Sequence, residues 1–101
     1  MIVAIFRSRI RPEAMSDYTA CTAAMRELAT KMPGFISVKA YYAEDGEKVA
    51  VHQWESAEHL RAWMEHPEHL EAQRRGRQEF YEDFTVFILD EPQVKQFARS
   101  V

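Results

Sequence analysis

The pair Asp45-Gly46 constrains the fold more than any other feature of this sequence. It separates two segments, 35–44 and 48–55, in which β-branched and aromatic residues recur. An Asp-Gly pair suits a two-residue hairpin turn, because both central residues of that turn need a positive φ. The chain is therefore expected to form an antiparallel hairpin at its centre, with paired residues on the same sheet face. The register that this turn sets pairs Tyr41 with Ala50, Lys39 with His52, and Ser37 with Trp54.

The segments before the hairpin predict a strand followed by a helix. Residues 2–10 are rich in β-branched and apolar side chains, which is typical of a strand. Residues 12–32 carry apolar side chains at steps of three and four, which indicates one face of an amphipathic helix. The pair Pro33-Gly34 ends this helix, since glycine suits the left-handed cap position and proline cannot continue the helix.

The segments after the hairpin repeat that order in reverse. Ser56 is a suitable N-cap for a second helix, which runs to about residue 79. His66 precedes Pro67, and a residue before proline avoids helical geometry, so a bend is expected there. Residues 84–89 predict the last strand.

The order strand, helix, strand, strand, helix, strand predicts an α+β, ferredoxin-like β-α-β-β-α-β fold. In this fold the four-stranded sheet is antiparallel and both helices lie on one face. The last strand is apolar on both faces, so a second copy of the chain is expected to cover the face without helices. With 101 residues, we expect a single domain over residues 1–101, with a C-terminal tail over 92–101.

The composition narrows the classes of partner. The net charge of −3 argues against a nucleic-acid binder, and Arg74, Arg75 and Arg77 stand among acidic residues. That cluster is either a solvated helix face or an anchor for an anionic ligand. The apolar run at residues 2–6 follows no basic segment and is too short for a signal peptide or membrane span, so we expect a cytoplasmic protein without a membrane partner.

Candidate site residues come from two places in the sequence. On the hairpin, His52 and Trp54 form either one wall of a small-molecule pocket or a packed pair at a subunit interface. After the bend, His66 and His69 have a spacing found in metal sites, but a metal needs three or four ligands, so surface or loop-capping roles are the alternative. No glycine-rich phosphate loop or dinucleotide fingerprint is present. Chemistry here is therefore cofactor-independent or uses a bound ligand such as haem.

The stretch from Val51 to Val86 resembles a known family. It reads VHQWESAEHLRAWMEHPEHLEAQRRGRQEFYEDFTV, with Trp54-Glu55-Ser56 at the strand end, Trp63 in the helix, and His66 and His69 at the bend. In order and spacing these residues are similar to the antibiotic biosynthesis monooxygenase (ABM) domain family, which belongs to the dimeric α+β barrel superfamily. The resemblance implies a homodimer whose two sheets face each other, with a cavity between sheet and helices in each subunit.

The resemblance also implies a monooxygenase that uses dioxygen on a small quinol- or anthrone-type aromatic, with no metal or flavin. His52 or His66 would be the general base, and Arg74 would stabilise anionic oxygen species. The remaining candidates would bind the substrate: Trp54, Trp63, Tyr41, His69 and Gln73.

Two alternatives remain beside that function. The first is a haem-binding or haem-degrading relative, because Trp63 matches a helix tryptophan of those members. Gln73 stands where they carry the iron-ligating histidine and Arg7 near their first-strand asparagine, which argues against haem. The second is a non-catalytic dimer that binds a small metabolite, because Ala50 replaces an asparagine that assists the polyketide oxygenases.

Overall fold

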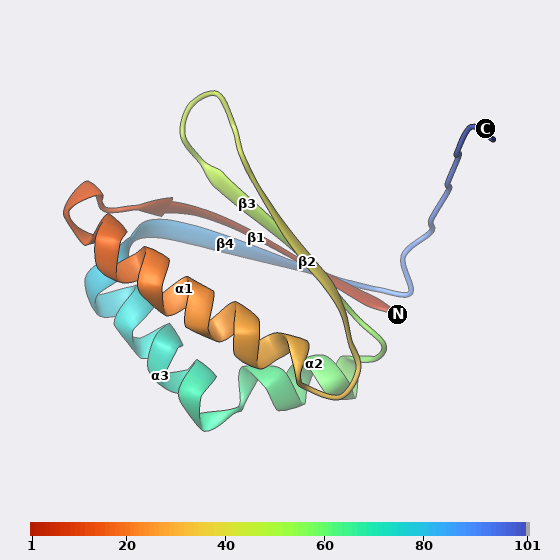
Figure 1. The fold of residues 1–101 in the computed structure, drawn as a ribbon, viewed down its shortest axis with the longest axis horizontal. Coiled ribbons are helices and arrows are strands. Elements are labelled where there is room, and N and C mark those ends of the chain that lie inside the picture. Colours follow the sequence, from red (N-terminus) through yellow and green to blue (C-terminus); the bar gives the residue numbers. More distant parts are fainter. Residues whose placement is uncertain (101) are drawn as a thin grey trace.

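The computed structural model describes residues 1–100 and confirms the predicted α+β, ferredoxin-like architecture (Figure 1). A four-stranded antiparallel sheet, in the order β2-β3-β1-β4, carries all the helices on one face. The elements in chain order are β1 (Ile2–Ile10), the 3-10 turn η1 (Pro12–Ala14), α1 (Met15–Thr30), β2 (Phe35–Tyr42), β3 (Lys48–Trp54), α2 (Ala57–Met64), α3 (Pro67–Arg75), the π-helical turn η2 (Gly76–Phe80) and β4 (Tyr81–Asp90).

Local signals account for the ends of the helices. The side chain of Ser56 accepts a hydrogen bond from the His59 N–H and so caps α2. His66 stands between α2 and α3 in extended geometry and accepts a hydrogen bond from the Glu68 N–H, while Pro67 begins α3. The turn after α1 needs Gly34, whose φ is 81°. The predicted bend thus divides the second helix into two.

The predicted hairpin is present, but its predicted register is wrong by one residue. Tyr41 pairs with Val49 and Val38 with His52. The cause is a three-residue loop, 44–46, which the Ala43 N–H closes by donating to the Glu47 carbonyl at 2.8 Å. Only glycine in this loop has a positive φ, 90° at Gly46, so the turn is the three-residue type rather than the two-residue type.

The register decides which side chains face the helices. Alternate β3 residues, from Lys48 to Trp54, lie on the helix-covered face, while Tyr41 and Val49 lie on the opposite face. At one end of the covered face the core packs tightly around Trp54 and Trp63. The residues buried with them are Ile2, Ala4, Ala29 and Leu60.

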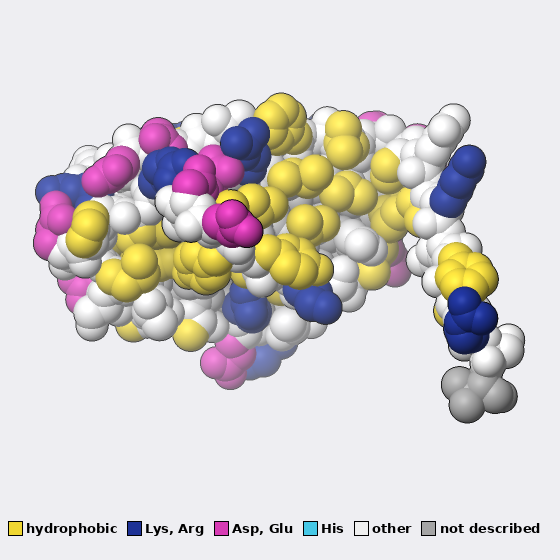
Figure 2. Space-filling model, turned by 90° about the horizontal axis from the view of Figure 1, so that it is seen from above, with side chains coloured by type: hydrophobic (Ala, Val, Ile, Leu, Met, Phe, Trp, Pro, Cys, Tyr) yellow, Lys and Arg dark blue, Asp and Glu magenta, His cyan; other side chains and the backbone are white. Residues whose placement is uncertain are grey.

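The opposite face of the sheet is apolar and carries no helix (Figure 2). We call it the outer face, and its apolar members are Val3, Ile5, Val49, Val51, Phe87 and Leu89. Beyond β4 the chain runs without regular secondary structure to residue 100, and Phe97 is 83% exposed. Val101, the last residue of the expected tail, lies outside the described residues. Within residues 1–100, no helix combines the length and apolar character needed to span a membrane.

Candidate functional site

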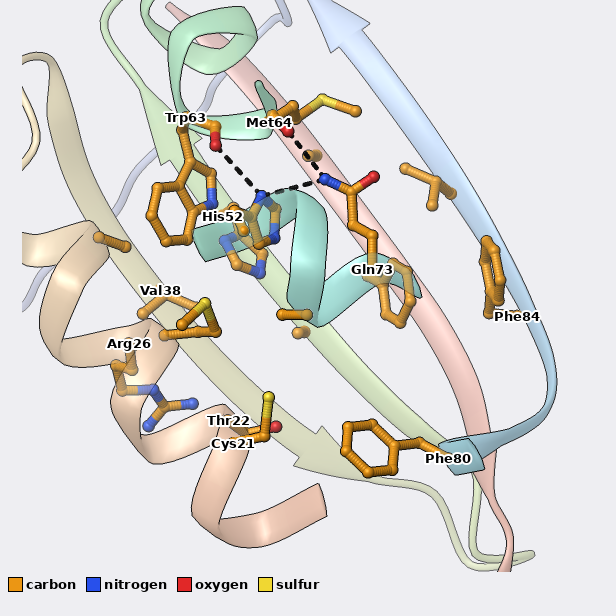
Figure 3. Close-up of a pocket in the computed structure, with 18 of the residues that line it drawn as sticks. Cys21, Thr22, Arg26, Val38, His52, Trp63, Met64, Gln73, Phe80 and Phe84 are labelled. Atoms are coloured by element: carbon orange, nitrogen blue, oxygen red, sulfur yellow. Dashed lines mark hydrogen bonds between the residues drawn. The ribbon is translucent and has the colours of Figure 1, made fainter. Parts of the chain in front are cut away.

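A pocket of about 270 Å³ lies between the helix-covered face of the sheet and the helices α1 and α3 (Figure 3). Its volume lies just below the usual range of about 300–1,000 Å³ for ligand sites, but a cavity of about 150 Å³ is already enough for benzene. Small side chains at neighbouring positions of β1 and β3, Ala4 and Ala50, leave this space open above the sheet. Aromatic and sulfur-containing side chains form a large part of its walls: Phe6, Tyr18, Cys21, Met25, Trp63, Met64, Phe80, Tyr81 and Phe84.

One end of the pocket contains His52 of β3. The pKa of His52 is lowered to about 4, mainly by burial and in smaller part by the neighbouring His69, Arg26 and Lys48. The imidazole is therefore neutral at pH 7, and its unprotonated ring nitrogen can accept a proton. His52 is therefore available as a proton acceptor at pH 7, and its low pKa makes it a weaker base than a free imidazole.

A second imidazole, that of His69, stacks on Trp63 at the same end, with ring centroids 4.3 Å apart. Its Nδ1 lies 3.2 Å from the Trp63 carbonyl oxygen (Figure 3). The Gln73 amide nitrogen lies 3.4 Å from the same Nδ1 but donates a shorter hydrogen bond, 2.8 Å, to the Met64 carbonyl. We therefore assign the proton to Nδ1, which leaves Nε2 as an acceptor. Burial lowers the pKa of His69 as well, so this ring also favours the neutral form.

The other end of the pocket contains a buried lysine. Lys48 is only 8% exposed, and its ammonium donates a hydrogen bond of 2.6 Å to the Tyr18 hydroxyl oxygen. Tyr81, whose ring lies 5.8 Å from that of Tyr18, is the neighbouring phenol. Burial raises the pKa of Tyr81, and the adjacent Tyr18 raises it further, so the phenol stays protonated. The pocket therefore has neutral bases at one end and a cation at the other.

The structure brings four of the predicted site residues to this pocket: His52, Trp63, His69 and Gln73. Trp54 does not line it. Its side chain lies two residues after His52 on β3 and is fully buried. It packs against Trp63 and Phe35, whose ring centroids are 6.1 and 5.4 Å away. Trp54 is therefore a core residue that supports the wall made by Trp63.

The remaining three predicted site residues lie outside the pocket. Tyr41 is on the outer face because of the corrected register. His66 caps α3, and its Nδ1 is occupied by the Glu68 N–H at 3.2 Å. Arg74 lies on the surface of α3, where it forms an ion pair with Glu71. The arginines that do line the pocket are Arg26 and Arg77.

The sequence interpretation missed Lys48, Tyr18 and Tyr81. Lys48 occupies the same alternation as Ala50 and His52, so the strand period places it on their face. Tyr18 belongs to the apolar stripe predicted for the first helix. Nothing in the sequence indicated that Tyr18, at the N-terminal end of that helix, would lie over Lys48, the first residue of β3.

The residues around the pocket do not fit a metal or a haem. No group of three or more His, Cys, Asp or Glu side chains within residues 1–100 is placed to hold a metal ion. The amide of Gln73, which stands where haem-degrading relatives are expected to carry the iron-ligating histidine, donates to the Met64 carbonyl, and the cavity holds about 270 Å³. That volume lies below the usual range of about 300–1,000 Å³ for cofactor sites.

Residues 1–75 match the sequence profile of the family described as antibiotic biosynthesis monooxygenase. The chain belongs to this family. YqjZ of Bacillus subtilis (strain 168), an uncharacterised protein, is 31% identical over 85 residues, which cover 84% of this chain and 75% of that protein. The family resemblance seen in the sequence is thereby confirmed.

Solved structures share the family's fold. Rv0793 from Mycobacterium tuberculosis superposes with a TM-score of 0.82 at 23% identity, covering 94% of this chain and 98% of that chain. SnoaB from Streptomyces nogalater, described as a cofactor-independent oxygenase, superposes with a TM-score of 0.77 at 15% identity, covering 92% and 94%. At these low sequence identities, the structural similarity is evidence of a shared fold only.

Proposed function

We propose that this protein is a cofactor-independent monooxygenase that acts on a small anthrone- or quinol-type aromatic. The observation that carries the proposal is the aromatic pocket with neutral His52 at one end. The family and the description of SnoaB as a cofactor-independent oxygenase support it. An electron-rich aromatic anion can reduce dioxygen directly, so the protein need only bind the substrate, exclude water and accept a proton.

The reaction can be written so that atoms and electrons balance. For an anthrone-type substrate, His52 accepts a proton from the reactive carbon, and the resulting anion passes electrons to dioxygen. The methylene carbon becomes a carbonyl and loses four electrons, one oxygen atom stays on that carbon, and the other leaves as water. Trp63, with the His69 ring stacked on it, forms part of the aromatic wall against which the ring system lies.

Dioxygen consumption by the chelator-treated protein tests this function. With a panel of anthrones and quinols, we expect uptake above the buffer rate, one dioxygen per substrate, and label from ¹⁸O₂ in the product. A panel that gives no uptake, while one of its members raises the melting temperature, would contradict the oxygenase and support a non-catalytic, ligand-binding protein.

We also propose that two copies pair through the outer face, as in a dimeric α+β barrel. An antiparallel sheet tolerates water on one face when that face is polar, but here the outer face is apolar. Of the neighbouring charges, Arg7 pairs with Glu47 and Arg9 with Asp45 within the chain, while the ammonium of Lys39 lies 5.9 Å from the centroid of the Tyr41 ring. A twofold pairing of apolar faces needs no further charge partner.

The variant Phe87→Glu tests this pairing. Phe87 is 45% exposed in the single chain and lies on the outer face opposite Ile5. Light scattering after size exclusion should give twice the chain mass of 11.8 kDa for the wild type and the single mass for the variant. Leu70→Glu is the control, because Leu70 is 50% exposed on α3, away from the outer face, and should leave the dimer intact. A dimeric Phe87→Glu protein would contradict the proposed interface.

A further inference from the structure

The buried ammonium of Lys48 has more hydrogen-bond donors than partners. It donates to the Tyr18 hydroxyl and lies 4.6 Å from the centroid of that ring. An ammonium has three N–H donors, and a tyrosine hydroxyl together with its ring face satisfies only part of them. Within residues 1–100, no carboxylate lies within 4 Å of the Lys48 nitrogen. A positive charge is thus held at the pocket wall without a counter-ion from the described chain.

The groups around this charge are neutral. Tyr81 keeps its proton because burial raises the pKa of its phenol. Ser8, the antiparallel partner of Lys48 on the neighbouring strand β1, is fully buried, and its Oγ has no hydrogen-bond partner in the described chain. A buried hydroxyl without a partner and a buried cation without a counter-ion are both unfavourable for stability, since each forgoes its hydration without full compensation. Of the two groups only Lys48 lines the pocket, so its ammonium is the group that a ligand can complete.

The position of Lys48 relative to His52 sets the kind of ligand. Both side chains lie on the helix-covered face of β3, four residues apart, which places their Cα atoms about 13 Å apart. Ala50 stands between them and keeps the intervening space open. A fused aromatic ring system that reaches both ends would place one edge near the imidazole and its opposite substituent near the ammonium.

We infer that the Lys48–Tyr18 end of the pocket binds an anionic oxygen substituent of the aromatic ligand, a carboxylate or an acidic phenolate. The remaining N–H donor capacity of the ammonium would hold this oxygen, and the Tyr18 hydroxyl would keep the ammonium in place. For turnover the inference rests on the proposed oxygenase function, with the anionic group orienting the reactive carbon toward His52. For binding it rests only on the pocket.

Calorimetric titration with naphthalene derivatives tests the inference. The three probes are naphthoate, neutral naphthamide of nearly equal shape, and a dinitronaphthol that is ionised at neutral pH. We expect the wild type to bind one or both anions about tenfold to 100-fold more tightly than naphthamide, as befits a hydrogen bond to a charged group. The anion that gains affinity identifies whether a carboxylate or a phenolate is the preferred substituent.

The variant Lys48→Met removes the ammonium charge and keeps an unbranched side chain of similar length. It should lose the preference for the anion, leave naphthamide binding unchanged, and melt no lower than the wild type because an unpaired buried charge is gone. Lys31→Met is the matched control, since Lys31 is an exposed lysine on the helical side that pairs with Glu27. It should keep the wild-type preference.

Two results would overturn the inference. One is wild-type protein that binds naphthamide as tightly as both anions. The other is an anion preference that survives within twofold in Lys48→Met. If Lys48→Met does not fold, Tyr18→Phe removes only the hydroxyl that positions the ammonium and should weaken anion binding several-fold.

The two proposals fail separately. An anion preference that depends on Lys48, in a protein that consumes no dioxygen with any substrate, would leave the anion site standing and remove the oxygenase function. Dioxygen uptake that is equal for charged and neutral substrates, and unchanged in Lys48→Met, would support the oxygenase function and contradict the anion site.

Discussion

Replacing Trp54 by alanine is expected to lower the free energy of unfolding by about 3–5 kcal/mol. The Trp54 side chain is fully buried, and its ring packs edge-on against Phe35 and nearly parallel to Trp63. Removal of the indole leaves a cavity that the sheet and α2 cannot close, since both are held by their own hydrogen bonds. Against a total stability of about 5–15 kcal/mol, this loss would leave many molecules unfolded at moderate temperature.

Urea unfolding followed by circular dichroism measures that loss, at one fixed protein concentration because the proposed pairing would couple to folding. Trp54→Phe is the matched control, because phenylalanine keeps a ring in the core. It also removes the indole Nε1, which has no hydrogen-bond partner in the described chain, so a clearly smaller loss is expected. A Trp54→Ala protein that loses less than about 1 kcal/mol would show that Trp54 does not hold this core.

Replacing His52 by glutamine is expected to lower kcat by about 10²–10⁴-fold, the usual effect of losing a positioned general base. Glutamine keeps a polar side chain of similar size but cannot accept the substrate proton. Dioxygen uptake with the best substrate of the panel measures the effect. His66→Gln is the comparison, since the His66 ring caps α3 outside the pocket and its loss should leave kcat within a few-fold of the wild type.

The pH dependence of the same reaction follows from the lowered pKa of His52. A base must be unprotonated to act, and with a pKa of about 4 the imidazole is almost entirely neutral at pH 6 and above. The wild-type kcat/KM for a substrate whose own charge does not change should therefore hold from pH 7 to about pH 5.5 and fall by half near pH 4. A fall centred near pH 6.5 would contradict a buried, desolvated His52.

The interpretation from residues succeeded where the signal is local. Ser56 and Pro67 mark the starts of two helices because a cap and a proline act on their own backbone, whatever the rest of the chain does. The alternation in β3 also placed His52 and Ala50 on one face correctly, because the side-chain period of a strand is two in any environment. Element order then led to the right fold and the right family.

The hairpin register shows where local reasoning ends. The pair Asp45-Gly46 is compatible with a two-residue or a three-residue loop, and only the pairing of the whole strands against β1 selects between them. The one-residue difference in loop length places Tyr41 on the outer face, away from the pocket.

By itself, the sequence determined the elements, their order and the alternation of side chains along β3, because backbone propensity, caps and side-chain period act over a few residues. Only the tertiary structure decided which of the candidates meet. Trp54 supports a wall, Arg74 pairs with Glu71 at the surface, and Lys48 stands buried beside Tyr18, thirty positions earlier in the chain. Those outcomes depend on how α1 and η2 pack across the sheet, and a contact between distant segments leaves no mark on the local pattern of either one.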